Sequence, residues 1–391
     1  MPAIIFTEEF CQPENLRPFT LTRQIQDIRV GILTIREKWE KGLGISSFDK
    51  FEDDYKDLDR SIHVTTDIPD DKYLLIHGNL LPSIKLIKAV KTLKPGEFIS
   101  VNDTGVVFCF TPKLVGKTDQ IKVNKSVIFK ETPDAINFPW DIFQLNDTAL
   151  RFDFNLLTAG RKSQPISKSN TGIKHSQIFI EKGAIVESCI LNASEGPIYI
   201  GKNAIVMEGS CLRGPVSIGK DAVVKMGTKI YGATSIGPGC LVGGEIKNSV
   251  LFAHSNKAHD GYLGDSVIGE WCNMGAGTNN SNLKNNAGEV RVWTSKGNLP
   301  AGKKCGFFMG DYSRTAINTA INTGTVIGTC CNVFGNGLTP KYIPSFSWGS
   351  EGVKRYEYEK AINDIGCWKK FKNHSVSENE KSILKYIFEH Y

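Results

Sequence analysis

An uninterrupted six-residue periodicity between Ile200 and Lys247 is the feature that most constrains the fold of this chain. Eight consecutive units each open with an aliphatic residue, and the fifth position of each unit is small or β-branched. The openers are Ile200, Val206, Leu212, Ile218, Val224, Ile230, Ile236 and Val242, and the fifth positions are Ala204, Ser210, Val216, Ala222, Thr228, Thr234, Cys240 and Ile246. Because an α-helix needs apolar residues at a spacing of about 3.6, the pattern predicts a parallel β-helix in which each unit forms one side of a triangular coil.

The dipeptide Ile-Gly recurs at residues 200, 218 and 236, so three units make one full turn. The register is interrupted at about residues 248–261 and 279–307, where we expect loops that leave the coil. It returns with openers at Tyr262, Ile268, Met274, Met309, Thr315, Ile321, Ile327 and Val333, and weaker units open upstream at Ile180 and Val186. A solenoid over residues 173–340 follows.

The first 150 residues carry a different pattern, in which apolar strands alternate with amphipathic helices. PAIIF predicts a strand, IQDIRVGILTIREKWEKGL a helix, and KYLLIHGNLLPSIKLIKAVKTL a strand, a loop and a helix. Such alternation predicts a sheet covered by helices, that is, an α/β domain. The polar stretch LTAGRKSQPISKSN predicts a linker. We therefore expect the α/β domain at residues 1–158, the linker at 159–172, the β-helix at 173–340 and a helical carboxy-terminal tail at 341–391.

Composition limits the classes of ligand and location. No apolar run approaches the ~18 residues that span a bilayer, and MPAIIFTEEF lacks the basic start of a secretory signal, so we expect a cytoplasmic protein without a membrane partner. The ten cysteines show no C-x-x-C spacing, which predicts neither a zinc site nor a disulfide framework. A net charge of +6 suits small anionic ligands such as sugar phosphates and is too weak and dispersed for nucleic acid.

His259 attracts attention because it breaks the solenoid register beside an expected loop. Glu245 and Lys247 stand near the end of the last regular unit, on the coil that leads into that loop. A carboxylate beside an imidazole holds one tautomer and raises its basicity, as a general base requires, and Lys247 would add positive charge for a phosphate. A histidine that only satisfies a loop hydrogen bond is the commoner alternative, and these residues alone leave both open.

The stretch KAHDGYLGDSVIGEWCNMGAGT, with the preceding Glu-x-Lys pair, resembles the acetyltransferase half of a bacterial bifunctional family, the N-acetylglucosamine-1-phosphate uridyltransferase/glucosamine-1-phosphate N-acetyltransferases. The family order is a Glu-x-Lys pair, a catalytic histidine, Tyr-Leu-Gly-Asp, Asn-x-Gly-Ala-Gly-Thr and a further asparagine. The matching residues are Glu245, Lys247, His259, Tyr262, Asn273, Ala276 and Asn282. Leu283, Lys284 and Asn285 replace the family's tyrosine, aspartate and glycine, so contacts there are expected to differ.

The resemblance implies a role for each matched residue. His259 would deprotonate the glucosamine amine as it attacks the thioester of acetyl-CoA, with Glu245 as its orienting partner. Lys247 and Tyr262 would hold the sugar phosphate, Asn273 and Asn282 the sugar and its amine, and the backbone near Ala276 the pantetheine arm. No metal is needed, and the resemblance also implies a homotrimer with active sites shared between neighbouring solenoids.

The amino-terminal domain resembles the uridyltransferase half of the same family with its phosphate loop replaced. The family carries Leu-x-x-Gly-x-Gly-Thr-Arg after the first strand, whereas IIFTEEFCQPENLRPFTLTR contains no glycine. Arg17 and Arg23 remain as basic residues that the resemblance places near the nucleotide phosphates. Asn79 stands where the family has a magnesium-binding aspartate, and an amide is a poorer Mg²⁺ ligand. The segment FPWDIFQLND at 138–147 resembles a later motif of sugar nucleotidyltransferases.

Several functions remain open at this point. The leading one is an acetyl-CoA-dependent N-acetyltransferase that acts on an amino-sugar phosphate and feeds UDP-N-acetylglucosamine synthesis. Its alternatives are an N-acyltransferase of a nucleotide-linked amino sugar and a non-catalytic scaffold that binds a nucleotide sugar. For the first domain we weigh an active, Mg²⁺-dependent uridyltransferase whose arginines replace the glycine loop, a domain that binds nucleotide sugar without turnover, and a structural remnant.

Overall fold

The computed structural model describes residues 3–47, 71–102, 104–111 and 125–391, and the chain divides into two compact units. Unit 1 comprises Met1–Pro13, Arg23–Ile28 and Leu33–Asn137, and unit 2 comprises Glu14–Thr22, Arg29–Ile32 and Phe138–Tyr391. Residues 138–158, expected in the α/β domain, thus make their contacts within unit 2. As boundaries of separately folding domains, the limits given above stay a prediction.

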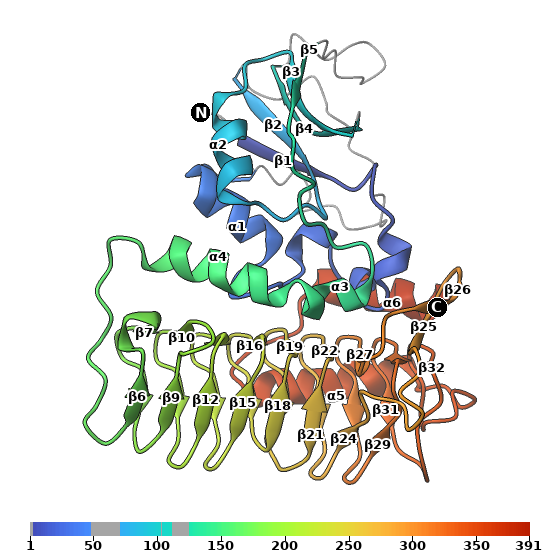
Figure 1. Ribbon diagram of the computed structural model, residues 1–391. Helices are drawn as coiled ribbons and strands as arrows, with labels where there is room; N and C mark the ends of the chain where they lie inside the picture. The colour runs from blue at the N-terminus through green and yellow to red at the C-terminus, as the bar shows by residue number, and fades with distance from the viewer. Residues whose placement is uncertain (1–2, 48–70, 103, 112–124) are drawn as a thin grey trace. The chain divides into compact units, whose positions relative to one another are not determined.

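Unit 1 is an α/β structure around a mixed five-stranded sheet of order β1-β2-β4-β3-β5 (Figure 1). The strands are β1(Ala3–Thr7), β2(Tyr73–His77), β3(Glu97–Val101), β4(Thr104–Phe110) and β5(Lys125–Ile128), and the α-helices are α1(Ile35–Leu43) and α2(Ile84–Thr92). β1 and β2 pair in parallel from Ala3 with Tyr73 to Thr7 with His77, so both strands end at the same edge. β4 pairs antiparallel with β2 and β3, a hairpin that the sequence pattern did not predict.

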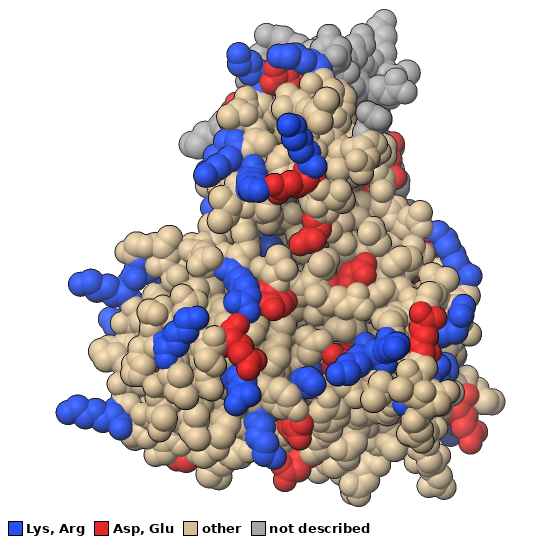
Figure 2. Space-filling model, in the orientation of Figure 1, with Lys and Arg blue, Asp and Glu red and all other residues tan. Residues whose placement is uncertain are grey.

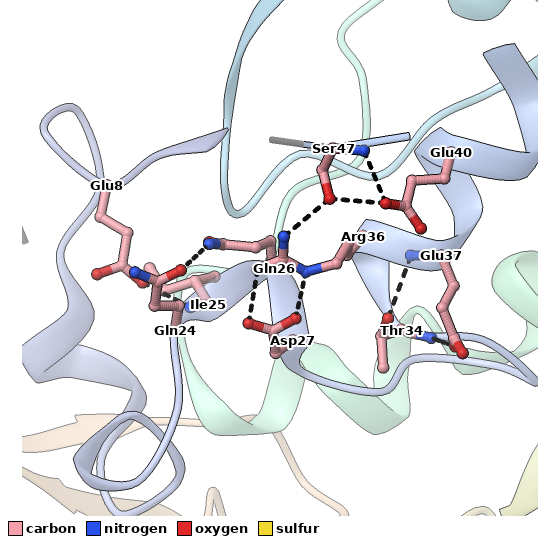
Figure 3. A network of polar contacts seen from close by, with 10 residues as sticks. All are labelled: Glu8, Gln24, Ile25, Gln26, Asp27, Thr34, Arg36, Glu37, Glu40 and Ser47. Carbon is pink, nitrogen blue, oxygen red and sulfur yellow. Dashed lines mark hydrogen bonds and ion pairs between the residues drawn. The ribbon is translucent and has the colours of Figure 1, made fainter. Parts of the chain in front are cut away.

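The helix expected over residues 25–43 is wrong in its first half. Residues Ile25–Asp27 form a 3-10 turn, and Gly31 has a φ of +81°, which an α-helix does not accommodate. α1 begins only after Thr34, whose hydroxyl accepts from the Glu37 amide at 3.2 Å while the Glu37 carboxylate accepts from the Thr34 amide at 2.8 Å. The Arg36 guanidinium donates to the Asp27 carboxylate of the turn, from Nε at 2.6 Å and from Nη2 at 3.0 Å (Figure 3). Turn and helix are thereby fixed to each other.

Unit 2 is built on a left-handed parallel β-helix whose strands stack into three sheets (Figure 1). The first coil sheet comprises β7(Ile178–Ile180), β10(Ile198–Ile200), β13(Val216–Ile218), β16(Thr234–Ile236), β19(Val250–Leu251), β22(Val267–Ile268), β27(Phe307–Met309), β30(Thr325–Ile327) and β32(Tyr342–Ile343). The second comprises β8(Ile185–Val186), β11(Ile205–Val206), β14(Val223–Val224), β17(Leu241–Val242), β20(Asn256–Lys257), β23(Asn273–Met274), β28(Arg314–Thr315) and β31(Asn332–Val333). The third comprises β6(Thr171–Ile173), β9(Ile190–Asn192), β12(Cys211–Arg213), β15(Lys229–Tyr231), β18(Glu245–Lys247) and β21(Tyr262–Gly264).

The predicted six-residue register is confirmed in the regular part of the coil. All eight openers from Ile200 to Val242 are buried with at most 2% exposure. Ile200 pairs with Ile218 and Val206 with Val224, each 18 residues apart. The openers therefore form three inward columns that together make one apolar core.

The loop expected at residues 248–261 is wrong. Strands β19 and β20 fall in this range and continue the first and second coil sheets. The turns here are shorter than 18 residues, since Ile230 pairs with Ile246 and Ile236 with Leu251. Ile246, expected at a fifth position, consequently takes an opener's place beside Ile230. The coil loses residues from its corners, so the sequence period fails although the coil continues.

The second interruption does leave the coil, as predicted, although it begins slightly later. β24(Asn279–Asn280) still pairs with β29(Ala320–Ile321) as part of the solenoid. The residues that follow include an antiparallel hairpin of β25(Arg291–Thr294) and β26(Gly297–Pro300). The coil then resumes, with Met309 paired to Ile268.

One corner of the coil carries a column of residues with left-handed backbone conformation. Its members are Asn203, Asp221, Gly239, His254, Trp271, Tyr312, Cys330 and Phe346, with φ between +56° and +63°. Large side chains avoid this conformation unless the surroundings compensate. Packing compensates the strain at Trp271, Tyr312 and Phe346, which form one cluster with α5(Tyr358–Phe371) and α6(Glu378–His390). The expected helical tail is therefore confirmed, and its contact surface is this corner.

Two further helices, α3(Pro139–Gln144) and α4(Asn146–Thr158), pack on the coil through a buried amide. The Asn146 side chain is fully buried, donates to the Ala233 carbonyl at 2.6 Å, and accepts from Ser235 Oγ at 3.0 Å and the Gly31 amide at 2.6 Å. In FPWDIFQLND this asparagine thus has a structural role. The remaining described helices are short 3-10 turns: η1(Pro13–Leu16), η2(Phe19–Leu21), η3(Ile25–Asp27) and η5(His175–Gln177).

Surface charge and hydropathy add two observations. Lys and Arg side chains lie interspersed with Asp and Glu on the face shown in Figure 2. Among the described helices, none combines the length and the apolar character needed to cross a membrane.

The buried imidazole of His77 should make the folding stability of unit 1 decrease in acid. It is 6% exposed at the end of β2, stacks on Phe10 at 4.9 Å, and its Nε2 has no hydrogen-bond partner among the described residues. Burial lowers its pKa from 6.5 to about 4, so the unfolded chain binds the proton first. The contribution that neutral His77 makes to the free energy of unfolding is fully present above pH ~6.5 and is lost as the pH falls to about 4. The loss is on the order of 3 kcal/mol.

Amide hydrogen exchange of β1 and β2 against pH measures this effect. His77→Phe keeps the stacking and should flatten the decline in protection between pH 6.5 and 4. Exposed His175→Gln is the control and should keep the wild-type slope. An unchanged slope in His77→Phe would contradict the assignment.

Candidate functional site

The bend that carries His259 lies where the chain passes from the second coil sheet to the third, between β20 and β21. Neighbouring coils hold this bend through its backbone, since the Gly261 carbonyl accepts from the Glu245 amide at 3.2 Å and the Asp260 carbonyl from the Gly277 amide at 3.1 Å. Gly261 has a φ of +126°, and a Cβ there would lie 2.2 Å from the Thr278 carbonyl oxygen. Glycine is therefore required, and the His259 side chain is exposed at the corner.

Four of the predicted residues gather on the outer face of the third coil sheet. Strand pairing sets Glu245 beside Tyr262 and Lys247 beside Tyr231. Asn282 joins them because its Nδ2 donates to the Tyr262 hydroxyl at 3.0 Å. We call Tyr231, Glu245, Lys247, Tyr262 and Asn282 the polar face. The solenoid register thus brings together residues that the motif spreads over more than thirty positions.

The polar face is anchored by a buried carboxylate. Asp265 is 3% exposed and accepts from Asn248 Nδ2 at 2.6 Å and from Asn282 Nδ2 at 2.5 Å. Charged acceptors make stronger hydrogen bonds than neutral ones, so Asp265 fixes the orientation of the Asn282 amide. The sequence motif Tyr-Leu-Gly-Asp contains this residue, but sequence reasoning did not single it out.

The two phenols of the polar face stay protonated at neutral pH. A hydrogen bond to Glu245 and burial raise the pKa of Tyr231 to about 12. Burial, followed by the charge of Asp265, raises the pKa of Tyr262 well above its usual value. The Lys247 ammonium lies 5.6 Å from the centre of the Tyr231 ring, which holds the cation at this face. The face therefore offers a ligand one cation, Lys247, and one hydroxyl donor, Tyr262, because the Tyr231 proton is donated to Glu245.

The structure does not join Glu245 to His259. Glu245 Oε1 accepts from the Tyr231 hydroxyl at 2.6 Å. In the part of the chain that the structure describes, the His259 imidazole makes no hydrogen bond or ion pair. The orienting role of Glu245 therefore stays a prediction, and it requires the other carboxylate oxygen or a rearrangement at Tyr231.

Lys257 is a residue at this corner that sequence reasoning missed. It occupies an inward position of β20, paired with Val242, and is only 1% exposed. Its ammonium donates to the Gly243 carbonyl at 3.4 Å and to the carbonyl of His259. Burial lowers its pKa to about 8. Its sequence signal, a lysine at an opener position, is hidden because the interrupted period predicts a loop over residues 248–261.

Asn273 and Ala276 lie away from the polar face within one chain. Asn273 belongs to β23 of the second coil sheet, where its Oδ1 accepts from Asn256 Nδ2 at 3.3 Å. Ala276 stands in the following turn, and its carbonyl accepts from the Asn318 amide at 2.7 Å. The predicted substrate residues are thus divided between two faces that flank the His259 corner.

The nucleotide-binding predictions for the first 80 residues fall in different surroundings. Arg17 belongs to unit 2, where it donates to the Tyr391 hydroxyl at 3.0 Å and lies 4.5 Å over that ring. This contact ties Arg17 to the end of the tail and gives its nucleotide role no support. Arg23 belongs to unit 1, where it is half-buried. Its nucleotide role stays a prediction.

The edge at which β1 and β2 end in unit 1 carries a carboxylate where the resemblance expects a phosphate loop. Glu8, directly after β1, is 6% exposed, and its Oε1 accepts from the Ile25 amide at 2.5 Å (Figure 3). Asn79, after β2, donates from Nδ2 to Asn137 Oδ1 at 3.0 Å. A buried carboxylate at this edge disfavours phosphate through like charge.

The same edge lacks the aspartate that the resemblance expects to bind magnesium. Mg²⁺ needs oxygen ligands in near-octahedral geometry, usually with one or two carboxylates. Asn79 supplies an amide, and the described residues contain no group of three His, Cys, Asp or Glu side chains that could hold a metal ion. The use of Mg²⁺ by unit 1 therefore stays a prediction.

Comparison with known proteins gives one family match and several partial relatives. Residues 4–162 match the family model described as sugar nucleotidyl transferase. The bifunctional sugar-1-phosphate nucleotidylyltransferase/acetyltransferase of Sulfurisphaera tokodaii is 40% identical over 91 residues, 23% of each chain. The bifunctional protein GlmU of Methanocaldococcus jannaschii is 32% identical over 101 residues, 26% of this chain and 25% of that one. The chain thus matches about a quarter of the length of these relatives.

Among solved structures, the Francisella novicida UDP-N-acetylglucosamine acyltransferase matches 55% of this chain and 86% of its own. Its identity is 17% and its TM-score 0.20, too low to carry an argument. The family match and the bifunctional relatives support the resemblance to the bifunctional family, at modest identity and partial coverage.

The hydrogen bond between Tyr231 and Glu245 can be tested without any substrate. Glu245→Gln removes the negative acceptor and should lower the pKa of Tyr231 from about 12 toward the usual value near 10. The titration is followed by NMR of ring-labelled tyrosine, with Tyr231→Phe to assign the signal. Glu195→Gln, an exposed carboxylate elsewhere on the coil, is the control. An unchanged pKa of Tyr231 in Glu245→Gln would show that the contact does not persist in solution.

Proposed function

We propose that the solenoid transfers an acetyl group from acetyl-CoA to the amine of an amino-sugar phosphate, with glucosamine 1-phosphate as the first candidate. The observation that carries this proposal is the grouping of Glu245, Lys247, Tyr262 and Asn282 beside the His259 corner, in the order of the matched family motif. The bifunctional names of the partial relatives support it. We place the reaction in the cytoplasm, as the composition predicts.

In the proposed reaction His259 removes the proton that keeps the amine from acting as a nucleophile. The amine nitrogen then forms a bond to the thioester carbonyl carbon, the carbon–sulfur bond breaks, and the thiolate of CoA leaves and takes up a proton. The exposed position of His259 leaves its imidazole free to meet a substrate. Backbone amides near Ala276 are the proposed contacts for the pantetheine arm.

The polar face suits the phosphate and hydroxyl groups of such a substrate. Lys247 supplies the positive charge. The Tyr262 hydroxyl accepts from Asn282, so its own proton remains available to a substrate oxygen. Because the phenol stays protonated at neutral pH, it acts here as a donor rather than as a base.

We also propose that the active form is a homotrimer that completes each site between neighbouring coils. Tyr262 and Asn273 lie on different faces of one chain, so a substrate held by both would need two chains. An outward ladder of Ile185, Ile205, Val223 and Leu241 on the second coil sheet offers apolar surface for such contact. Ile185 is 55% exposed in the single chain.

A nucleotidyltransferase activity of unit 1 is the second candidate function. The family match over residues 4–162 favours it, while Glu8 and Asn79 do not support a phosphate loop or a magnesium site. Binding of a nucleotide sugar without turnover and a purely structural role remain its alternatives.

Release of free CoA tests the acetyltransferase proposal directly. With acetyl-CoA and glucosamine 1-phosphate, the wild-type protein should release CoA, and His259→Ala should lower turnover by roughly 10²–10⁴-fold, the usual contribution of a positioned base. The thermal midpoint should stay nearly unchanged, because an exposed corner residue supports little of the core. His175→Ala, another exposed histidine of the solenoid, should behave like the wild type.

The same assay separates the alternatives. Release with a nucleotide-linked amino sugar in place of the sugar phosphate would favour the second acyltransferase. No release with any amino sugar would indicate that the solenoid is a binding scaffold. Full activity in His259→Ala would indicate that His259 only stabilises the loop.

Pyrophosphate release tests unit 1. With UTP, magnesium and N-acetylglucosamine 1-phosphate, an active unit 1 should release pyrophosphate, and Arg23→Ala should abolish this while leaving CoA release unchanged. Arg17→Ala is not an equivalent variant, because Arg17 holds the tail of unit 2. A rate equal to that without enzyme, across several nucleotides and sugars, would leave unit 1 as a binding or structural part.

A further inference from the structure

A lysine of the carboxy-terminal tail, Lys372, reaches the second coil sheet. Lys372 directly follows α5 as its C-cap, and its ammonium donates to the Gly239 carbonyl at 3.1 Å, the His254 carbonyl at 2.8 Å and Asn256 Oδ1 at 2.8 Å. Gly239 and His254 belong to the left-handed corner described above. An ammonium has three protons, and all three find acceptors here. The half-buried cation is thereby compensated.

These contacts determine how the Asn256 amide is oriented. An ammonium donates and cannot accept, so the atom of Asn256 that faces Lys372 must be the oxygen. Asn256 Nδ2 then points the other way and donates to Asn273 Oδ1 at 3.3 Å. Asn256 is only 8% exposed, so water does not readily replace either contact.

The orientation is passed on to Asn273. Because Asn273 Oδ1 is the acceptor, its Nδ2 is turned away from Asn256, and in the described part of the chain this nitrogen has no hydrogen-bond partner. Asn273 is half-buried, so a ligand can reach it. The amide can therefore offer a ligand a donor, and its acceptor is already engaged.

We infer that Lys372 and Asn256 are positioning residues that present Asn273 Nδ2 as a hydrogen-bond donor to an oxygen of the sugar substrate. The inference rests on the proposed function, in which Asn273 binds the sugar. It adds the direction of that hydrogen bond, and it gives the tail a function in substrate recognition. The substrate group at Asn273 must accept, as a hydroxyl or phosphate oxygen does.

Asn256→Asp is the sharpest test because it is nearly isosteric. The carboxylate still accepts from Lys372, now with a charge, so tail docking should be retained or strengthened. It has no proton for Asn273 Oδ1, so the Asn273 amide should turn and donate Nδ2 to it. Asn273 would then face the substrate with an oxygen, and the dissociation constant for glucosamine 1-phosphate should rise roughly 3- to 10-fold, the effect of one hydrogen bond.

A second variant excludes simple charge repulsion. Lys372→Met adds no negative charge but releases Asn256, so sugar-phosphate binding should weaken in the same direction. Lys370→Met, an exposed lysine in the last turn of α5, is the matched control and should bind like the wild type. Binding is measured by calorimetry, with the KM for acetyl-CoA and the thermal midpoint measured beside it.

The outcomes are distinct. Weaker sugar-phosphate binding with unchanged KM for acetyl-CoA and an unchanged or higher midpoint in Asn256→Asp supports the positioning role. Wild-type binding in Asn256→Asp overturns it, as does a general loss of stability and of both substrates in Lys372→Met. A wild-type protein that binds the sugar phosphate but releases no CoA contradicts the proposed reaction alone, whereas one that binds no amino sugar overturns both.

Discussion

The stacking of aliphatic side chains inside the coil is the interaction on which the rest of unit 2 depends. Burying one such side chain contributes about 1.5–3 kcal/mol, and each opener lies directly above the next in its column. Once the columns are in register, they also determine which outward residues lie beside one another. Glu245 lies beside Tyr262 because Ile246 lies beside Leu263. The polar face is therefore a consequence of the core.

The left-handed corner shows how the coil and its tail stabilise each other. Small or polar residues such as Asn203 and Asp221 occupy the corner where it faces solvent, and asparagine and aspartate tolerate this conformation best. Trp271, Tyr312 and Phe346 occupy it where α5 and α6 dock, and burial of their rings compensates the backbone strain, which is about 1–2 kcal/mol per residue. Tyr312 also donates to Glu380 at 2.7 Å, and Glu380 belongs to the capping box of α6. The Glu380 carboxylate thus both caps α6 and binds it to the corner of the coil.

The sequence was informative where one local period acts alone and misleading where distant contacts decide. The openers from Ile200 to Val242 were predictable because each repeats the same local environment. The strands between 248 and 261 were not, because shortened corners shift the period while the core continues. Helix 25–43 was overestimated because its apolar spacing continues through Gly31, whose left-handed φ the sequence alone does not reveal. Asn146 and Lys372 were not identified, since their partners are more than eighty residues away in sequence.

Lys257 shows that the core itself is adapted to the proposed site. The inward column of the second coil sheet contains Val206, Val224 and Val242 before it and Met274 after it, so an apolar residue would complete the column. A buried ammonium is costly unless acceptors surround it, and replacing such a charge with a hydrophobic residue often stabilises a protein. The acceptors of Lys257 are two backbone carbonyls, that of Gly243 in the preceding coil and that of His259 itself. The Lys257 ammonium lies inside the coil and reaches the His259 carbonyl from the core side. The lysine therefore fixes the backbone of the residue that the proposed reaction depends on, at the expense of an ideal apolar column.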